Sequence, residues 1–243
     1  MIPFLGPGDP FPPVELALTE PDGLLAAGGT LAARRLVDAY SRGIFPWFNE
    51  GDPILWWSPD PRTVLRPAQL HVSHSLRKRL RKVAFMVTVD AAFGRVLDEC
   101  AAPRADEAGT WLSSGMRRAY TTLHRAGLAR SIEVWMDGEL AGGLYGVAIG
   151  RMFYGESMFS RRTDASKIAM AQLCAQLVRW DMPLIDCQLE TEHLLSLGAE
   201  SVPRRRFIAE LERLVTGDAP SWRLDPDLAG DPGHAPLTGS QRG

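Results

Sequence analysis

Cysteine is scarce in this chain of 243 residues: it occurs three times, at widely separated positions and never as a closely spaced pair. A disulfide framework or a structural zinc site is therefore not expected. No apolar run reaches the roughly eighteen residues of a membrane span. The N-terminus also lacks the basic and apolar segments of a secretory signal. We expect a cytoplasmic protein that makes no membrane contact.

The number of histidines and the net charge are also low. The five histidines show no ligand spacing, so the sequence predicts no metal site. A net charge of −2 argues against a protein that coats nucleic acid over its whole surface. One segment is different, because residues 61–89 hold seven basic residues and no acid. Taken alone, this segment is either a solvated helix face or a surface that contacts phosphates. Its dense part is Arg77, Lys78, Arg79, Arg81 and Lys82.

Composition divides the chain into three parts. Residues 1–61 are rich in Pro, Gly and Trp and predict a small N-terminal domain, with one helix at 30–42 capped by Thr30. Residues 62–216 alternate between helix and strand patterns and predict the main domain. Residues 217–243 are rich in Pro and Gly with little apolar content, which predicts a mobile tail.

The main domain predicts an antiparallel meander followed by a helix and a further strand. Asp137-Gly138 is a strong hairpin signal, and Asp164 is placed to cap the helix after the meander. This order resembles the acetyltransferase-like (GNAT) core. The expected fold class is α+β, a small N-terminal domain plus a GNAT-like domain with a mixed, largely antiparallel sheet flanked by helices. Helices are expected at 73–83, 91–101, 113–126, 164–180 and 204–215, and strands at 85–89, 131–136, 139–149, 152–160 and 183–189.

A family resemblance covers roughly residues 20 to 207, and five motifs within that range carry it. They are GIFPWF at 43–48, ILWWSPDPR at 54–62, GESMFSRRTDASK at 155–167, LIDCQ at 184–188 and HLLSLGA at 193–199. The chain resembles the leucyl/phenylalanyl-tRNA–protein transferases. The resemblance implies a GNAT-like enzyme without a cofactor, which moves Leu, Phe or Met from aminoacyl-tRNA to the N-terminal Arg or Lys of a protein and so marks it for degradation. A monomer is expected.

The segment LIDCQ places two polar residues on one predicted strand. Alternation puts Asp186 and Gln188 on the same face, where burial without partners is costly. They are either a structural hydrogen-bonded pair or a catalytic one, and the resemblance assigns them to catalysis. Cys187, on the opposite face, and His193, just past the strand, are the alternative nucleophile and base, although a core cysteine and a capping histidine explain them as well.

Other substrate contacts come from the resemblance. Glu156 would face the cationic acceptor, and Thr191 stands where some members have Asn. The aromatic residues near the terminal adenosine would be Tyr40, Trp47, Trp111 and Tyr120. The apolar aminoacyl pocket would be formed by Leu144, Phe153, Met158, Met170, Leu173 and Ile185. The resemblance also favours phosphate contact for the basic cluster.

Two other functions fit part of the pattern. A GNAT acyltransferase would bind acyl-coenzyme A, whose pyrophosphate usually meets a Gly-rich turn at a helix N-terminus. Here that turn is SRRTDAS, with an acid at the expected cap. A non-catalytic RNA-binding module would explain the basic cluster and the aromatic residues. It leaves Asp186, Gln188 and Glu156 without a role.

Overall fold

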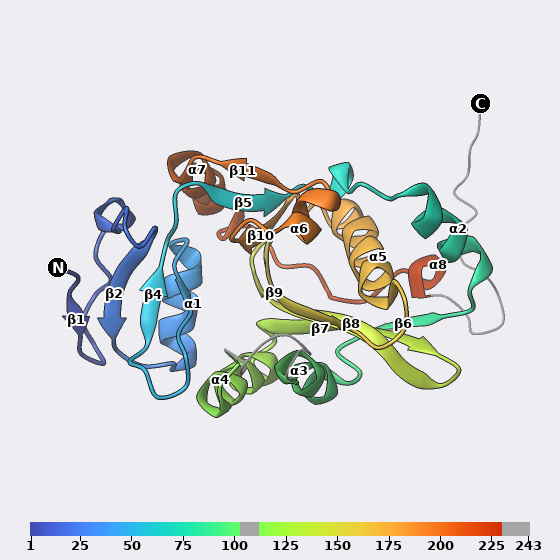
Figure 1. Cartoon of the computed structure of the whole chain (residues 1–243), viewed down its shortest axis with the longest axis horizontal. Coiled ribbons are helices and arrows are strands. Elements are labelled where there is room, and N and C mark those ends of the chain that lie inside the picture. The colour runs from blue at the N-terminus through green and yellow to red at the C-terminus, as the bar shows by residue number, and fades with distance from the viewer. Residues whose placement is uncertain (103–111, 230–243) are drawn as a thin grey trace.

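The computed structural model describes residues 1–102 and 112–229, which form two sheets. The smaller sheet has four strands in the order β1-β2-β4-β3, and α1 lies against it at the left of Figure 1. The larger sheet has seven strands in the order β11-β5-β10-β9-β8-β7-β6. The elements of the smaller sheet are β1 (Phe4–Leu5), β2 (Leu24–Gly28), α1 (Ala33–Ser41), β3 (Phe45–Pro46) and β4 (Leu55–Trp57).

The larger sheet separates two helical layers. One face is covered by α5, and the other by α3 and α4 (Figure 1). Its strands are β5 (Arg62–Leu65), β6 (Met86–Val89), β7 (Ala129–Met136), β8 (Glu139–Ile149), β9 (Met152–Ser160), β10 (Leu184–Gln188) and β11 (Glu200–Val202). Its helices are α2 (His74–Lys82), α3 (Phe93–Ala101), α4 (Ser114–Arg125), α5 (Ala165–Arg179), α6 (Glu192–Ser196), α7 (Arg204–Leu214) and α8 (Pro226–Ala229); two short 3-10 turns lie at Val14–Leu16 and Pro67–Gln69.

The central meander follows from local sequence. Asp137 and Gly138 both have positive φ, 53° and 78°, which suits the tight hairpin between β7 and β8. Strands β6 to β9 pair antiparallel, and β10 then pairs parallel to β9 after the crossover through α5. The helix packs closely on the sheet, because a Cβ added to Gly142 would stand 2.6 Å from the Cβ of Ala165. The predicted α+β class, with its mixed and largely antiparallel sheet, is confirmed.

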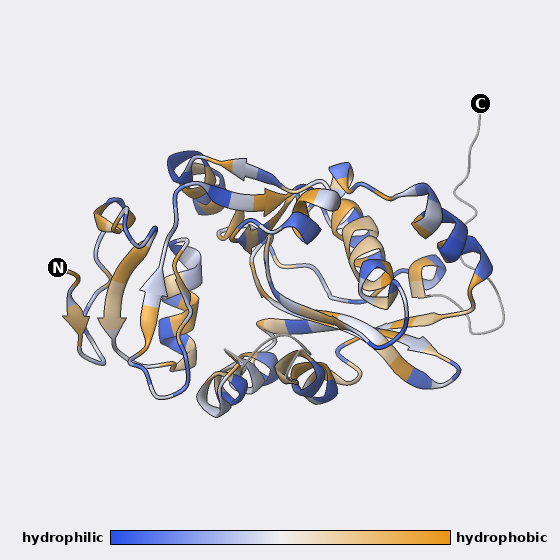
Figure 2. Cartoon of the chain, viewed as in Figure 1, coloured by the Kyte–Doolittle hydropathy of each residue, from blue (hydrophilic) through white to orange (hydrophobic). Residues whose placement is uncertain are grey.

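The apolar residues form two clusters, one on each side of the larger sheet. The cluster on the α3–α4 side continues into the N-terminal sheet, and the other is built around α5. Figure 2 shows α5 as largely apolar, whereas α2 is mostly hydrophilic. No helix within the described ranges is long and apolar enough to cross a membrane.

Several predictions of detail were wrong. Thr30 is not a cap, because α1 begins after Ala32, which makes no side-chain capping bond. Asp164 precedes α5 but adopts a left-handed conformation with φ of 63° and makes no capping bond. Strands β5 and β11, which complete one edge of the larger sheet, were missed. All four residues of β5 are buried, so it shows no alternation, and β11 has only three residues.

The segment predicted as a tail is ordered through residue 229. Trp222 is buried, with its ring centroid 5.0 Å from that of Trp180 and 5.7 Å from that of Phe153. Arg179 also binds Asp225 and Asp227. The rest of the predicted tail, residues 230–243, lies outside the described residues. The predicted domain boundary at residue 61 falls between β4 of one sheet and β5 of the other.

Candidate active site

The candidate site lies where β9 and β10 stop pairing. The recorded pairs run from Leu184 with Met152 to Asp186 with Tyr154. Beyond that pair, β9 continues along β8 alone, while β10 ends against β5 at Gln188. Glu156 and Gln188 each lie two residues past the last pair, one on each strand. The end of this parallel pairing thus places a carboxyl group and an amide at the point where the two strands part.

Asp186 is fully buried and is held by Arg62 of β5. Arg62 Nε donates to Asp186 Oδ1 at 2.8 Å, and Nη2 donates to Oδ2 at 2.6 Å. The third nitrogen, Nη1, donates to the carbonyl of Gly43 at 3.0 Å, and the rings of Phe45 and Phe207 flank the guanidinium. Such a two-point pair fixes the carboxylate in one orientation. Sequence reasoning treated Arg62 as part of a basic surface, and this was wrong.

Gln188 does not continue the regular alternation of β10. Its φ is +57°, and the pairing register shifts between Asp186 and Gln188, so the prediction that both share a face by strand geometry does not hold. The two residues are linked in another way, because the Gln188 N–H donates to Asp186 Oδ1 at 3.0 Å. The side-chain Nε2 of Gln188 is shielded from solvent and has no hydrogen-bond partner in the described part of the chain. It is therefore a shielded donor whose acceptor is not among the described residues.

Glu156 is held by two tyrosines from different helices. Tyr40 of α1 donates to Oε1 at 2.7 Å, and Tyr120 of α4 donates to Oε2 at 2.5 Å. Burial raises the pKa of Glu156 to about 7; the two hydroxyl groups oppose this shift, and the nearby Asp186 adds to it. Both tyrosine rings are fully buried. They therefore present no open ring face for stacking, and they reach the site through their hydroxyl groups.

The six predicted pocket residues come together. All belong to the apolar cluster on the α5 side of the sheet, with Met158 at its partly buried edge. They come from four elements: β8, β9, β10 and α5. The members are Leu144, Phe153, Met158, Met170, Leu173 and Ile185.

The remaining predicted aromatic residues differ in exposure. Trp47 is 45% exposed and lies beside Trp57, with ring centroids 5.6 Å apart. Trp56, which was not among the predicted site residues, is fully buried, and its Nε1 donates to the carbonyl of Gly28, which is a structural role. Trp111 lies outside the described residues. Thr191 caps α6, where its hydroxyl group accepts from the Leu194 N–H at 3.2 Å.

The two alternative catalytic residues are placed as follows. Cys187 is buried in the apolar cluster, and its burial raises the pKa of the thiol above the usual range, which disfavours the thiolate. His193 is exposed on α6. Among the described residues, no group of three or more His, Cys, Asp or Glu side chains could hold a metal ion.

The predicted basic cluster lies on α2, at the opposite end of the view from α1 (Figure 1). Four of its five side chains are exposed. Arg79 is less exposed, with its Nε 3.8 Å from a carboxylate oxygen of Asp164. The exposed members are Arg77, Lys78, Arg81 and Lys82.

Comparison with known proteins shows which family the chain matches. The model described as leucyl/phenylalanyl-tRNA protein transferase matches residues 64–212, and the model of its N-terminal domain matches residues 29–60. A leucyl/phenylalanyl-tRNA–protein transferase of Nitrosomonas europaea is 56% identical over 227 residues, which cover 93% of this chain and 96% of that protein. One of Nitrosospira multiformis is 58% identical over 215 residues, covering 88% and 93%. Among solved structures, a GCN5-related N-acetyltransferase from Kribbella flavida matches with a TM-score of 0.36 and 13% identity, over 65% of this chain and 56% of that one.

Proposed function

The chain belongs to the leucyl/phenylalanyl-tRNA protein transferase family, and we propose that it transfers Leu, Phe or Met from aminoacyl-tRNA to the N-terminal Arg or Lys of an acceptor protein. It is a transferase that uses charged tRNA. The observation that carries the chemistry is the Nε2 group of Gln188, a shielded donor where β9 and β10 part that has no acceptor within the described ranges. We expect the reaction in the cytoplasm and by a monomer.

The reaction is a direct aminolysis of the tRNA ester. The neutral α-amine of the acceptor attacks the ester carbonyl carbon, a C–N bond forms, and the bond to the 3′ oxygen of the tRNA breaks. One amine proton leaves with that oxygen as its hydroxyl group. The negative charge that develops on the carbonyl oxygen needs a positioned donor, and Gln188 Nε2 supplies one. Because the ester is already activated, positioning is the main requirement.

Asp186 acts as a positioning residue in this proposal. Both of its oxygens accept from Arg62, one of them also accepts from the Gln188 N–H, and no part of the side chain reaches solvent. It is therefore poorly placed to accept a proton from substrate. Of the two roles open at the sequence level, base or orienting charge, the contacts favour the second.

Glu156 is proposed to face the acceptor. The acceptor brings a cationic Arg or Lys side chain as well as its amine, and a carboxylate opposite it would stabilise that charge. With a pKa of about 7, Glu156 is partly ionised near neutral pH. The apolar cluster behind the strands would receive the Leu, Phe or Met side chain. Trp47 offers an exposed ring for the terminal adenosine, and the exposed α2 residues would contact tRNA phosphates.

A transfer assay tests the function. Purified protein is given radiolabelled leucyl-tRNA and a peptide with N-terminal Arg, and labelled peptide is expected. The Gln188→Ala variant should lose about 10²–10³ in kcat, the effect of removing one oxyanion donor, while its tRNA affinity stays the same. Gln69→Ala, at an exposed glutamine outside the site, is the matched control. Acyl transfer from acetyl-coenzyme A, with none from charged tRNA, would overturn the proposal.

A further inference from the structure

Two adjoining hollows lie between α3 and α4, on the face of the larger sheet opposite α5. Their volumes are about 540 and 480 Å³, and both are lined by Gly94, Thr121 and Arg125. They form a single groove, which we call the α3–α4 groove. No role for it follows from the motifs, and it lies far from the basic helix α2 in the fold (Figure 1).

The α3–α4 groove carries an excess of unpaired positive charge. Its two acids are both in contact with arginines, Asp90 with Arg130 at 2.7 Å and Asp98 with Arg117. Three further arginines line it, are exposed, and make no ion pair within residues 1–102 and 112–229. They are Arg95, Arg118 and Arg125. A concave surface with this charge attracts anions.

The spacing of these charges suits a chain of anions. Arg118 and Arg125 are seven residues apart on α4, so they lie on one face of the helix about 10 Å apart along its axis. Thr121 and Thr122 lie between them on the same face, and both line the groove. Both threonine hydroxyl groups donate to backbone carbonyl oxygens of α4, so the two guanidinium groups are the donors that remain for a ligand. Two such groups about 10 Å apart match a run of phosphates better than they match one isolated anion.

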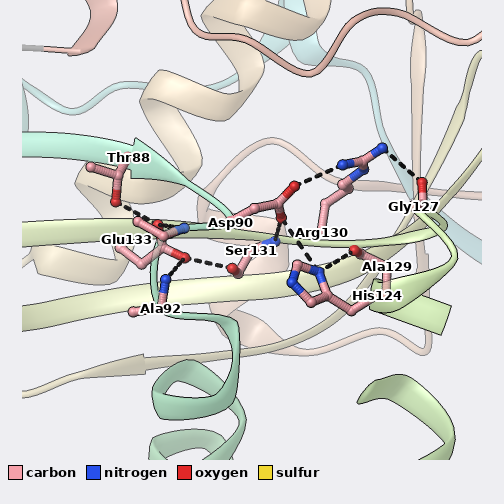
Figure 3. Close-up of polar contacts among 10 residues, drawn as sticks. Thr88, Asp90, Ala92, His124, Gly127, Ala129, Arg130, Ser131 and Glu133 are labelled. Carbon is pink, nitrogen blue, oxygen red and sulfur yellow. Dashed lines mark hydrogen bonds and ion pairs between the residues drawn. The ribbon is translucent and has the colours of Figure 1, made fainter. Parts of the chain in front are cut away.

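A buried polar network holds the groove in shape (Figure 3). Glu133 of β7 accepts from the backbone N–H groups of Ala91 and Ala92 at the start of α3. At the end of α4, the ring of His124 lies parallel to that of Phe93, with centroids 4.0 Å apart, and His124 Nδ1 is 2.9 Å from the carbonyl oxygen of Ala129. Both helices are thus tied to one strand, so the groove exists before any ligand binds.

The other face of α4 leads to the candidate site. Tyr120 points inward from this helix and donates to Glu156. One helix therefore presents a catalytic-site hydroxyl group on one face and arginines on the other. An acceptor peptide beginning with Arg or Lys would be repelled by these arginines, whereas the phosphates of a tRNA would be attracted.

We infer that the α3–α4 groove binds the phosphate backbone of the tRNA near its aminoacylated end, through Arg118 and Arg125. This rests on the proposed function. It adds a second RNA contact surface to the one proposed on α2, on the side of the sheet that α4 covers.

The test is the double variant Arg118→Ala/Arg125→Ala in the full chain. With leucyl-tRNA as donor, KM should rise about tenfold while kcat is unchanged. The slope of log affinity against log salt should fall in magnitude by about 1.4–1.8, since each of the two lost phosphate contacts contributes about 0.7–0.9. With leucyl-adenosine, which has no phosphate, the variant should match the wild type. The matched control is Arg205→Ala/Arg206→Ala, two exposed arginines of α7.

The other possible results of this experiment also decide for or against the inference. An unchanged KM and salt slope for tRNA would overturn the inference. Equal losses with both donors would also overturn it, because they would indicate damage to the site and not a lost phosphate contact. Binding of uncharged tRNA, followed by fluorescence anisotropy, tests the groove without any catalysis. If the wild type transfers nothing from charged tRNA, the proposed function fails, whereas weakened tRNA binding by the double variant would still support the groove.

Discussion

Two carboxyl groups on neighbouring strands have different electrostatic environments. Asp186 on β10 is fully buried against a guanidinium that binds both of its oxygens. Glu156 on β9 also sits at the split between the strands, but its partners are two neutral hydroxyl groups. The first site compensates a buried charge with a full opposite charge. The second compensates it only with hydrogen bonds.

The difference separates a structural role from a titrating one. Breaking an ion pair that has no solvent contact costs a large part of the free energy of unfolding. Asp186 is therefore suited to fixing the backbone at Gln188. Hydroxyl donors stabilise a carboxylate less than burial destabilises it, which explains why the pKa of Glu156 rises to about 7. A group that titrates near neutral pH can respond to an arriving cation. A comparison of variants at the two sites tests this division.

The largest expected effect is at Asp186. Replacing it with Ala leaves Arg62 buried and unpaired, which should lower the free energy of unfolding by about 3–5 kcal/mol. The double variant Arg62→Met/Asp186→Leu removes both charges and should recover most of this loss. Urea denaturation gives the free energies of unfolding of the wild type and the two variants, which are compared at a constant m-value. If Asp186→Ala were within 1 kcal/mol of wild type, the ion pair would not hold this region together.

The next effect is the pH dependence set by Glu156. Its folded pKa of about 7 lies above the ordinary value of 4.5, so the folded state binds an extra proton between these values. Stability from this group is complete below about pH 4.5 and is lost as the pH rises through 7. The shift corresponds to at most about 3 kcal/mol, and partial exposure reduces this to roughly 2.

Glu156→Gln should remove this dependence. Thermal unfolding at pH 5 and pH 8 should show the wild type losing more stability than the variant, by an amount on the order of 2 kcal/mol. Glu139→Gln is the control, because Glu139 is exposed at the start of β8. Parallel pH profiles for wild type and Glu156→Gln would show that Glu156 is not the titrating group.

The sequence predicted the parts of the fold that depend on neighbours along the chain. Strands β8 and β9 were predicted with their observed bounds, because period-two patterns and the Asp137-Gly138 turn are local signals. Strands β5 and β11 were missed because their stability comes from pairing with each other and with β10. Such pairings between segments far apart in the chain leave no trace in the local sequence pattern.

In the candidate site, too, the sequence predicted some residues and missed the partners that lie far away in the chain. Asp186 and Gln188 stood out as polar residues on one predicted strand, and Glu156 came from the family resemblance. Their partners did not, because Arg62 is 124 positions from Asp186 and Tyr40 is 116 positions from Glu156. One physical signal for Arg62 was available: a carboxylate predicted on a buried strand requires a cation. The sequence offers 27 basic residues and no means of choosing among them.

The smallest expected effect tests the hydroxyl groups themselves. Tyr40→Phe removes one donor to Glu156 and keeps the ring, so the ionised carboxyl loses one hydrogen bond and its pKa should rise by about one unit, or about 1.4 kcal/mol. The matched control is Tyr154→Phe, since this equally buried hydroxyl group donates to the backbone carbonyl of Tyr40 and not to a carboxylate. Both variants lose a buried hydrogen bond and some stability. Only Tyr40→Phe should move the midpoint of the pH–stability curve upward, and a shift of the same size in both variants would mean that packing, and not donation by the hydroxyl group, controls Glu156.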